Sequence, residues 1–439
     1  MKKLLFAFIF FIFCAIDVKA YVIPKLYIDG NIENMNSKSD IRKVKISYES
    51  EDLTFSSYAT LKIQGNWSLR YDKKNYTIKL YKDELYEEKN YIDVLWGKQY
   101  EYCLKANWID KTHSRNIVTA NIVSDINKKY DLFINTPNYG AIGGFPIEIY
   151  ENNKFLGLYT FNIPKDAWLF NMDKKNNNNI ILVSEDWFDS NLLNSTKYLN
   201  KWSIETGPED NTTYEKLKRL IKFIVTSSDK EFKNNINKYI DLDATLNYFI
   251  MCEFANLYDN VGKNMLLVTY DGNYWYPALY DLDSSFGTTY DGMLLDDYNY
   301  IDRIEFNLLY NRILKNFSKE YTDRYFELRK EILTKENIME KFTEFSKKIP
   351  DETLNLEKNK WENLLGYDIE QIEEYLNERI PVLDDLMRKR KYDYYKNNIY
   401  YFIPIITIGI ITIVGALFYR EKNKLKKTIK KMINKLSEI

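Results

Sequence analysis

Residues 259–287 read D-N-V-G-K-N-M-L-L-V-T-Y-D-G-N-Y-W-Y-P-A-L-Y-D-L-D-S-S-F-G, and they carry the strongest chemical signal in the chain. Asp259 opens the stretch, and Asn264 follows five residues later. An apolar run then leads to Asp281 and Asp283, just ahead of a Phe-Gly pair. Phosphoryl transfer uses such side chains, because a carboxylate orients the attacking hydroxyl while an Asn and an Asp hold the metal ion beside the phosphate. The stretch therefore predicts a phosphate-transfer site.

The spacing within this stretch matches that of protein kinases. In these enzymes the catalytic-loop Asp and Asn are also five residues apart, and the metal-binding Asp follows in a D-F-G motif. We therefore expect Asp259 to orient a substrate hydroxyl and accept its proton, and we expect Asn264 and Asp281 to bind a divalent metal. Leu257-Tyr258 stands where kinases have His-Arg, so the spacing suggests this chemistry without deciding it.

The acidic residues of the stretch also have structural interpretations. At the end of a strand, Asp281 and Asp283 would project to one face, and a paired carboxylate face is costly unless a cation neutralises it. Asp283 could instead cap the Ser284-Ser285 turn, and Asp259 could belong to an ordinary turn. We retain Asp283 as the third candidate metal ligand.

The first part of the chain is predicted to be rich in strands. Polar and apolar residues alternate there, with Gly or Asn between the runs. The predicted strands include Lys43–Tyr48, Ala59–Gln64, Asn75–Tyr81, Pro146–Tyr150 and Leu156–Phe161. A helix is expected over Ser114–Lys129, with Thr112 or Ser114 as its cap. Residues 171–205 are polar and rich in Asn, which predicts an exposed loop.

The later part of the chain has helical periodicity. Helices are predicted over Thr213–Thr226 and Leu242–Leu257, followed by a hairpin of Met265–Tyr270 with Trp275–Tyr280. Residues 307–396 read as charged amphipathic helix interrupted by Pro350 and Pro381. The sequence therefore predicts an α+β, two-lobed, kinase-like fold. Its strand-rich N-lobe would span 21–165, and its helical C-lobe, with the acidic motif, would span 166–398.

Both ends of the chain carry targeting signals. Residues 1–20 have a basic start, an apolar centre and small residues at the exit, as in a secretory signal peptide. Residues 399–419 are uncharged and long enough to cross a bilayer. The basic segment 420–439 follows, which predicts a cytoplasmic tail. We expect a single-pass membrane protein whose ectodomain lies outside; a buried core helix is the alternative for 399–419.

Composition excludes several classes of function. The chain has 62 basic and 63 acidic residues, and its lysine-rich tail leaves the ectodomain net acidic. An acidic ectodomain argues against general binding of nucleic acid. His113 is the only histidine, which removes H-E-x-x-H metalloproteases and zinc sites with two histidines. Cys103 and Cys252 are the only cysteines after residue 20, so at most one disulfide can form.

Several further segments accompany the acidic stretch in a fixed order. They are Ile63–Ser68 (I-Q-G-N-W-S), Lys73–Leu80 (K-K-N-Y-T-I-K-L), Leu104–Trp108 (L-K-A-N-W) with Asp110 and Arg115-Asn116, and Phe155–Tyr159 (F-L-G-L-Y). Together with Asp259–Gly287, they resemble the CotH-type spore-coat kinase family, which consists of atypical protein kinases. The resemblance covers about residues 60–290, and the Ile372–Leu386 segment with Arg379 extends it.

The resemblance also shows where this chain diverges from its relatives. Gln64 stands where many family members have Arg, and Ile163 lies near the position of a Glu in many others. The chain is therefore similar to a divergent branch of the family.

Three basic residues are candidates for binding nucleotide. Lys74 and Lys79 lie on a predicted strand, and a lysine there could neutralise phosphates as a point charge. Lys79 is preferred, because its neighbours Ile78 and Leu80 would face the core opposite it. Arg115, near the start of the predicted helix, could hold a phosphate or could form a structural ion pair.

The resemblance implies a function as well as a fold. It implies a kinase that transfers the γ-phosphate of ATP, with Mg²⁺ or Mn²⁺, to Ser or Thr of coat or surface proteins. One alternative is a catalytically inactive relative that serves in surface adhesion or coat assembly. A second takes Asp281-Leu282-Asp283 as the D-x-D metal site of a sugar-nucleotide transferase, although this leaves Asp259 and Asn264 unexplained.

Overall fold

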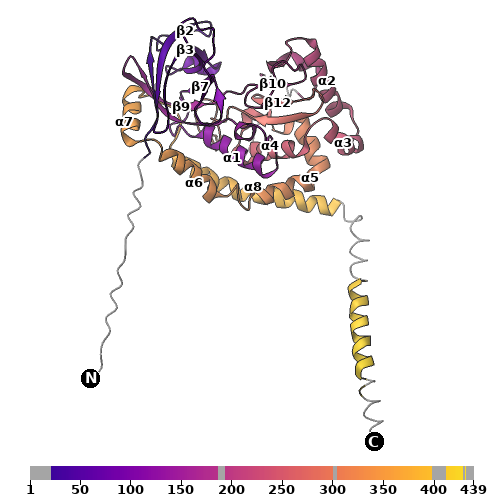
Figure 1. Cartoon of the computed structure of the whole chain (residues 1–439). Helices are drawn as coiled ribbons and strands as arrows, with labels where there is room; N and C mark the ends of the chain where they lie inside the picture. The colour runs from indigo at the N-terminus through magenta and orange to yellow at the C-terminus, as the bar shows by residue number, and fades with distance from the viewer. Residues whose placement is uncertain (1–20, 186–192, 300–303, 398–411, 429–430, 432–439) are drawn as a thin grey trace, which may run out of the picture. The chain divides into compact units, whose positions relative to one another are not determined.

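The computed structural model describes residues 21–185, 193–299, 304–397, 412–428 and 431. The chain forms two compact units (Figure 1). Unit 1 contains the chain up to Asn176, together with Leu279–Leu295 and Glu336–Glu373. Unit 2 contains Asn177–Ala278, Asp296–Lys335 and the chain from Glu374. The fold is mixed α and β with a strand-rich part and a helical part, as predicted, and the two-lobed kinase-like arrangement stays a prediction.

Unit 1 is built around a closed barrel of seven strands, and the sequence had predicted only that this part of the chain is rich in strands. Its strands are β1 (Lys25–Asp29), β2 (Ile41–Glu49), β3 (Thr54–Gln64), β4 (Asn75–Tyr81), β7 (Glu101–Lys105), β8 (Gly144–Glu151) and β9 (Lys154–Asn162). Their order is β1-β2-β3-β4-β7-β9-β8. Neighbouring strands are antiparallel, except that β1 and β8 pair in parallel and so close the barrel.

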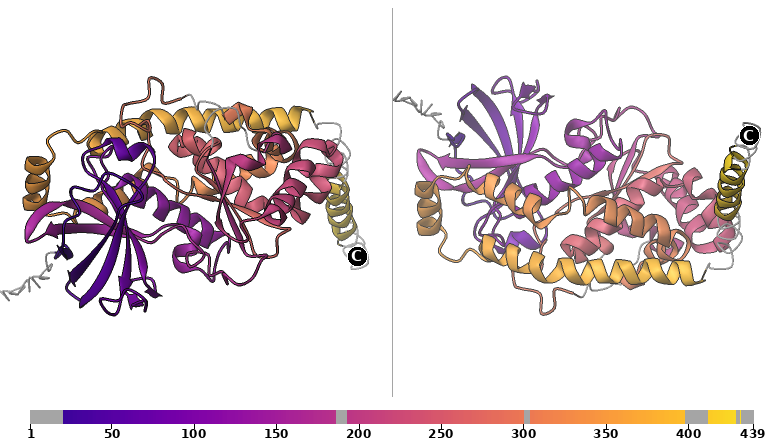
Figure 2. Two further views of the ribbon diagram at one scale, coloured as in Figure 1. Left: turned by 90° about the horizontal axis from the view of Figure 1, so that it is seen from above. Right: turned by 90° about the horizontal axis from the view of Figure 1, so that it is seen from below.

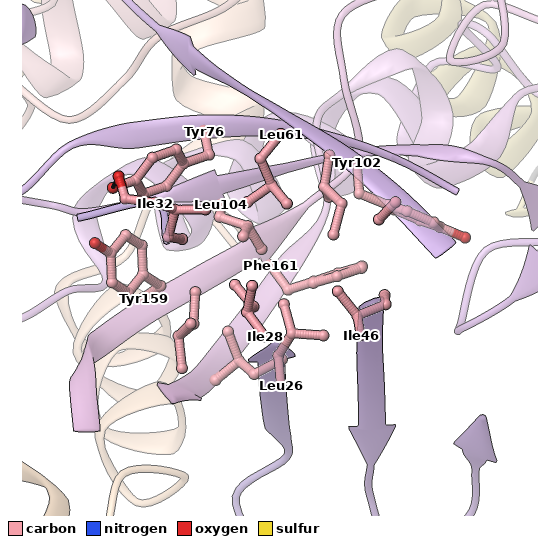
Figure 3. Close-up of a cluster of buried hydrophobic side chains, with 14 of the residues drawn as sticks. Leu26, Ile28, Ile32, Ile46, Leu61, Tyr76, Tyr102, Leu104, Tyr159 and Phe161 are labelled. Carbon is pink, nitrogen blue, oxygen red and sulfur yellow. Dashed lines mark hydrogen bonds between the residues drawn. The ribbon is translucent and has the colours of Figure 1, made fainter. Parts of the chain in front are cut away.

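Every second side chain along each strand points into the barrel, and these side chains fill its interior. Figure 3 shows Leu26, Ile46, Leu61, Leu104 and Phe161 turned toward one another in its interior. Because successive side chains of a strand point to opposite faces, the residues between these positions face outward. This confirms the five strands predicted in this region, and β4 begins and ends at the predicted residues.

Helix α1 (Arg115–Lys129) follows β7 directly in unit 1. Ser114 occupies its N-cap position, as predicted, but its side chain makes no capping bond. The cap comes from Asp110, whose Oδ2 accepts from the backbone N–H groups of Ser114 and Arg115, both at 2.9 Å. The acceptor therefore comes from a residue four positions before the N-cap, where the sequence had suggested Thr112 or Ser114.

The remaining elements of unit 1 are short. They are η1 (Trp67–Arg70), β5 (Ile92–Asp93), β6 (Lys98–Gln99), η2 (Pro137–Gly140), α6 (Lys335–Ser346, from its second residue) and α7 (Asp351–Lys360). Pro350 precedes α7 directly, which agrees with the interruption predicted there.

Unit 2 combines a four-stranded sheet with helices, and Figure 2 shows these elements from two opposite directions. The sheet has the order β11-β10-β12-β13. Its strands are β10 (Ile180–Ser184), β11 (Trp202–Thr206), β12 (Met265–Thr269) and β13 (Trp275–Leu279). The helices are α2 (Asn211–Thr226), α3 (Asp229–Asn235), α4 (Leu242–Ala255), α5 (Leu308–Leu328) and, from Glu374 on, α8 (Ile369–Asn397). Short turns complete it: η3 (Thr196–Lys201), η4 (Ile236–Lys238), η5 (Tyr258–Val261) and η6 (Ile304–Phe306).

Two predictions for this part of the chain are wrong. Residues 171–205 were expected to be a loop, yet they contain β10 and most of β11. All five residues of β10 are buried, so an apolar run of four outweighs the Asn-rich stretch before it. Helix α8 also continues through Pro381, where an interruption had been predicted. The predicted helices that became α2 and α4, and the hairpin of β12 and β13, are confirmed.

The predicted targeting segments lie largely outside the described residues. The signal peptide, 1–20, and the first part of the predicted membrane segment, 399–411, belong to the portions that the structure does not describe. Residues 412–428 are helical. Within the described ranges, no helix has the length and apolar character needed to cross a bilayer.

Candidate active site

Lys105 is the last residue of β7 and lies on the outward face of the barrel wall. Its neighbour Leu104 is in the barrel core, so the Lys105 side chain points the other way. The side chain is only 13% exposed. An ammonium group has three donors, yet Lys105 Nζ has no hydrogen-bond partner among the residues that the structure describes. A buried cation with unused donors is suited to binding an anion.

Asp281 is the acidic neighbour of Lys105. Its Oδ1 lies 3.6 Å from Lys105 Nζ, which is an ion pair but is longer than a hydrogen bond. The Asp281 side chain remains 34% exposed. Burial by itself would lower the pKa of Lys105, but electrostatic interactions, first with Tyr280 and then with Asp281, outweigh it and raise that pKa. Lys105 is therefore a permanent cation at neutral pH.

A second lysine lies beside this pair. Lys165 Nζ is 4.6 Å from the centre of the Tyr280 ring, and Lys105 Nζ is 5.8 Å from the same ring. Two ammonium groups thus contact one aromatic side chain next to a partly exposed carboxylate. Such a cluster can bind a polyphosphate together with its counter-ion.

Asp281 does not lie on a strand, as the sequence had suggested. Strand β13 ends at Leu279, and Asp281 has a left-handed backbone conformation with φ of 59°. The expectation that Asp281 and Asp283 share a strand face is therefore wrong. Both side chains are partly exposed, while Leu282 between them is buried. The backbone N–H of Leu282 donates to Asn116 Oδ1 at 3.0 Å, which fixes this turn to α1.

Arg115 holds the segment that follows Asp283. Its side chain is fully buried, and one terminal nitrogen donates to the carbonyls of Ser285 and Phe286 at 2.6 and 3.3 Å. Its other terminal nitrogen donates to Gln371 Oε1 at 2.6 Å. Arg115 Nε also lies 3.4 Å from Asp110. These contacts agree with the structural alternative for Arg115. Its side chain holds the segment that follows Asp283 in place.

The two lysines favoured by the sequence lie in other surroundings. Lys79 points away from the core, as predicted, and is 41% exposed with Nζ 3.1 Å from Glu101. Lys74 Nζ donates to the carbonyls of Leu69 and Tyr71 in the turn before β4. Each therefore has partners of its own in unit 1.

Asp259 and Asn264 belong to unit 2 and share one loop there. Asp259 lies in η5 and is 9% exposed, and Asn264 has φ of 60°. The loop is fixed at three points within unit 2. Tyr248 donates to the Asn260 carbonyl at 2.6 Å, the Asn264 N–H donates to the Ser184 carbonyl at 3.1 Å, and Asn307 donates to the Val261 carbonyl at 2.8 Å. These three hydrogen bonds hold the loop in place. Asp281 and Asp283, by contrast, belong to unit 1.

The donors at Asp281 are compatible with a hard divalent cation. Magnesium prefers carboxylate oxygens and takes its remaining ligands from water and substrate phosphates. The Asp281 carboxylate has Lys105 as its one described partner and keeps a third of its surface exposed, so oxygen lone pairs remain for a metal. Over the described ranges, no three His, Cys, Asp or Glu side chains gather into a complete metal cage.

The comparison with protein families now has a structural basis. The CotH kinase protein family matches residues 61–393, which is most of the chain. The chain belongs to the CotH kinase family. No curated protein matches it. At the level of the family, membership indicates a kinase, and a kinase uses a nucleoside triphosphate with a divalent metal.

Sequence reasoning missed Lys105, although its segment was among those that carry the resemblance. The chain has 62 basic residues, and alternation alone favoured Lys79. Lys105 ends β7, a strand that was not among those named from the sequence, and α1 is the next element along the chain.

A groove of about 790 Å³ lies elsewhere on unit 1. It is formed over β1, β2 and β3 by residues such as Tyr27, Lys45 and Tyr58. None of the predicted site residues lines it. The charged groups converge instead at Lys105 and Asp281, which form the candidate site.

Proposed function

We propose that this CotH kinase family member is an extracytoplasmic protein kinase that transfers the γ-phosphate of ATP to Ser or Thr hydroxyls of coat or surface proteins. The observation that carries the proposal is the pair formed by Lys105 and Asp281. In kinases a lysine on the third strand contacts the nucleotide phosphates, and an Asp after the catalytic loop holds the metal. Lys105 and Asp281 have these two side-chain types at 3.6 Å.

The order of elements supports the same assignment. Lys105 ends a strand, α1 follows it, and β8 and β9 come next. In kinases the lysine likewise lies on a strand, and its Glu partner lies on helix αC. Helix α1 contains no glutamate, and here Asp281 lies beside the lysine instead. We therefore assign to Lys105 the nucleotide role for which the sequence had suggested Lys79 or Lys74.

The remaining roles follow the kinase scheme. Asp259 would orient the substrate hydroxyl and take its proton as the oxygen attacks the γ-phosphorus. The bond from that phosphorus to the bridging oxygen breaks, and ADP leaves. Asn264, Asp281 and Asp283 are the proposed ligands of Mg²⁺ or Mn²⁺, which, when bound, neutralises phosphate charge. Lys105 and Lys165 would add positive charge next to the same phosphates.

The location of the protein is part of the proposal. Residues 1–20 have the pattern of a secretory signal, and 399–419 form an uncharged segment followed by a basic tail. We propose a single-pass membrane protein whose ectodomain is exported. Its partners would be Ser- and Thr-containing proteins of the coat or surface, and its acidic ectodomain would not bind nucleic acid.

The test is phosphate transfer by the full-length protein in mild detergent. The protein is incubated with ATP labelled at the γ-phosphate, Mg²⁺ or Mn²⁺ and a Ser/Thr-rich acceptor, with Asp281→Ala as the matched variant. We expect label in the acceptor with wild type, and none with Asp281→Ala or after the metal is chelated. Label that persists in Asp281→Ala would contradict the metal assignment.

A second candidate is a catalytically inactive relative that binds partners. The absence of a glutamate in α1 favours it, since active kinases require the lysine–glutamate pair. This candidate predicts no transferred label and no rise in melting temperature with ATP. A larger rise with a sugar nucleotide than with ATP would instead favour a sugar-nucleotide transferase.

A further inference from the structure

Among the residues that the structure describes, the side chain of Asn162 has no hydrogen-bond partner at either end. Asn162 is the last residue of β9 and is 1% exposed. Neither Oδ1 nor Nδ2 is hydrogen-bonded within the part of the chain that the structure describes. A buried polar group without a partner is costly, and native proteins rarely keep one without a reason. The adjacent outward residue Thr160, by contrast, accepts a bond from Asn107 at 3.3 Å.

The register of the barrel places Asn162 close to Lys105. Asn162 pairs with Cys103, and Thr160 pairs with Lys105. Because Leu104 and Phe161 face the barrel core, these four residues share the outward face. Asn162 is therefore the diagonal neighbour of Lys105 across the β7–β9 pair, and such positions lie roughly 7–8 Å apart. This separation is comparable to the length of the ribose that lies between a nucleobase and its first phosphate.

Small side chains surround Asn162 on this face. The row across the sheet runs from Thr77 on β4 through Cys103 and Asn162 to Gly144 on β8. Thr77 is half-buried, whereas Cys103 is buried. Burial raises the pKa of the Cys103 thiol to about 12, so the thiol stays uncharged at neutral pH. The neighbours of Asn162 along this row are therefore small and uncharged, and none of them competes with a base for the amide through a charge.

We propose that the Asn162 amide recognises the base of the nucleotide and selects adenine. This rests on the function proposed above. A side-chain amide matches adenine in two bonds, with Oδ1 accepting from the 6-amino group and Nδ2 donating to a neighbouring ring nitrogen. Guanine presents an acceptor in place of that amino group, so the same amide cannot make both bonds.

Gly144 pairs with Asn162, and its lack of a side chain leaves the room that the Asn162 amide occupies. A Cβ at Gly144 would lie 2.4 Å from Asn162 Oδ1 and 2.6 Å from Ile117 Cδ1. Both distances are far below ordinary contact. The Gly144→Ala variant therefore displaces the amide without removing it, which gives a second way to disturb recognition.

The experiment measures dissociation constants of full-length protein in detergent by calorimetry. The probes are ATP, GTP and purine riboside triphosphate, which is ATP without the 6-amino group. We expect wild type to prefer ATP to both analogues. In Asn162→Leu, affinity for ATP should fall roughly 10- to 100-fold, while affinity for the purine analogue, which has only the ring-nitrogen bond to lose, should fall less. Gly144→Ala should shift the same ratio in the same direction.

Asn162→Leu has a further signature that a purely structural residue would not give. Removing an unsatisfied buried amide should raise the melting temperature of the nucleotide-free protein by on the order of a few degrees. The matched control is Gln99→Leu on β6, outside the proposed site, since Gln99 Nε2 is also buried with no partner in the described part of the chain, while its Oε1 accepts from the Tyr100 N–H. This control should leave the ratio of ATP to purine analogue unchanged.

Three outcomes would overturn the inference. Equal binding of ATP and the purine analogue by wild type would do so while leaving the proposed kinase function intact. An unchanged ratio in Asn162→Leu would have the same meaning. No binding of any nucleoside triphosphate would overturn the inference and the proposed function together.

Discussion

Two lysines of unit 1 are both withdrawn from solvent, yet their surroundings differ in kind. Lys73 is fully buried, and its Nζ donates to the Ala106 carbonyl at 2.8 Å, to the Leu158 carbonyl and to Glu357 Oε1 at 2.6 Å. Lys105 has one acidic neighbour at 3.6 Å, and no described group accepts a hydrogen bond from its ammonium.

The difference separates a structural ion pair from a binding site. Every donor of Lys73 is used, and Glu357 also accepts from the Leu158 N–H at 2.7 Å, so the pair ties α7 to β9. Burial lowers the pKa of Lys73, and Glu357 opposes that effect. Among the described residues, Lys105 keeps unused hydrogen-bond donors and Asp281 keeps unused acceptors. A phosphate and its metal ion can use them. Unused hydrogen-bonding capacity in a buried charge is thus a better sign of function than burial itself.

The largest expected effect on stability concerns the ion pair of Lys73 and Glu357, in which every donor of the lysine is used. Lys73→Met removes one partner of a buried ion pair and leaves the Glu357 carboxylate uncompensated. We expect a loss of about 3–5 kcal/mol in the free energy of unfolding. The double variant Lys73→Met/Glu357→Leu should recover most of this loss, because no buried charge remains. Chemical denaturation gives both values, and a double variant no better than the single one would show that the charge was not the cause.

A buried carboxylate in unit 2, Glu253, extends the comparison to the effect of pH on stability, because its hydrogen-bond partners are in place. Burial tends to raise the pKa of Glu253, but Arg390, Tyr321 and Tyr310 outweigh it and hold that pKa below its ordinary value of 4.5. Folding therefore gains stability from this carboxylate above about pH 4.5, and the gain is lost as pH falls through the folded-state pKa.

Glu253→Gln should lower the free energy of unfolding at pH 7 by about 1–3 kcal/mol, since a charge-assisted bond is replaced by a neutral one. The deficit should shrink as the pH is lowered below 4.5, because the wild-type carboxylate then loses its advantage. Denaturation curves at a series of pH values measure it. A deficit that does not change with pH would show that the Glu253 charge is not what stabilises the cluster.

The smallest expected effect is the stability change at Lys105. Lys105→Met breaks only a long, partly exposed pair, so we expect the free energy of unfolding to change by less than about 1 kcal/mol. The same substitution would thus have very different consequences at Lys73 and at Lys105. A loss at Lys105 as large as that at Lys73 would remove the distinction between the two sites.

Local signals explain what could be predicted from the sequence. Alternation places Ile78 and Leu80 in the core and gives β4 its observed ends. The parallel pairing of β1 with β8 closes the barrel between residues far apart in the chain, and no local pattern reports it. β10 was missed because the Asn-rich residues before it dominated the pattern.

The candidate site shows the same limit. The types and spacing of Asp259, Asn264 and Asp281 could be read directly, but the left-handed turn at Asp281 could not. Lys105 was passed over because its importance depends on sheet register and on its distance to Asp281, which sequence spacing does not contain. Asn162 has no sequence signature, since its significance lies in the hydrogen bonds that it lacks.

The central claim is that Lys105, and not the exposed Lys79, contacts the nucleotide. The most direct test compares phosphate transfer from ATP by full-length wild type, Lys105→Met and Lys79→Met under the same conditions. We predict that Lys105→Met loses about 10²–10³-fold in kcat/KM, as when one preorganised charge contact to a transition state is removed. Lys79→Met should stay within a few-fold of wild type. Activity retained by Lys105→Met and lost by Lys79→Met would contradict the account.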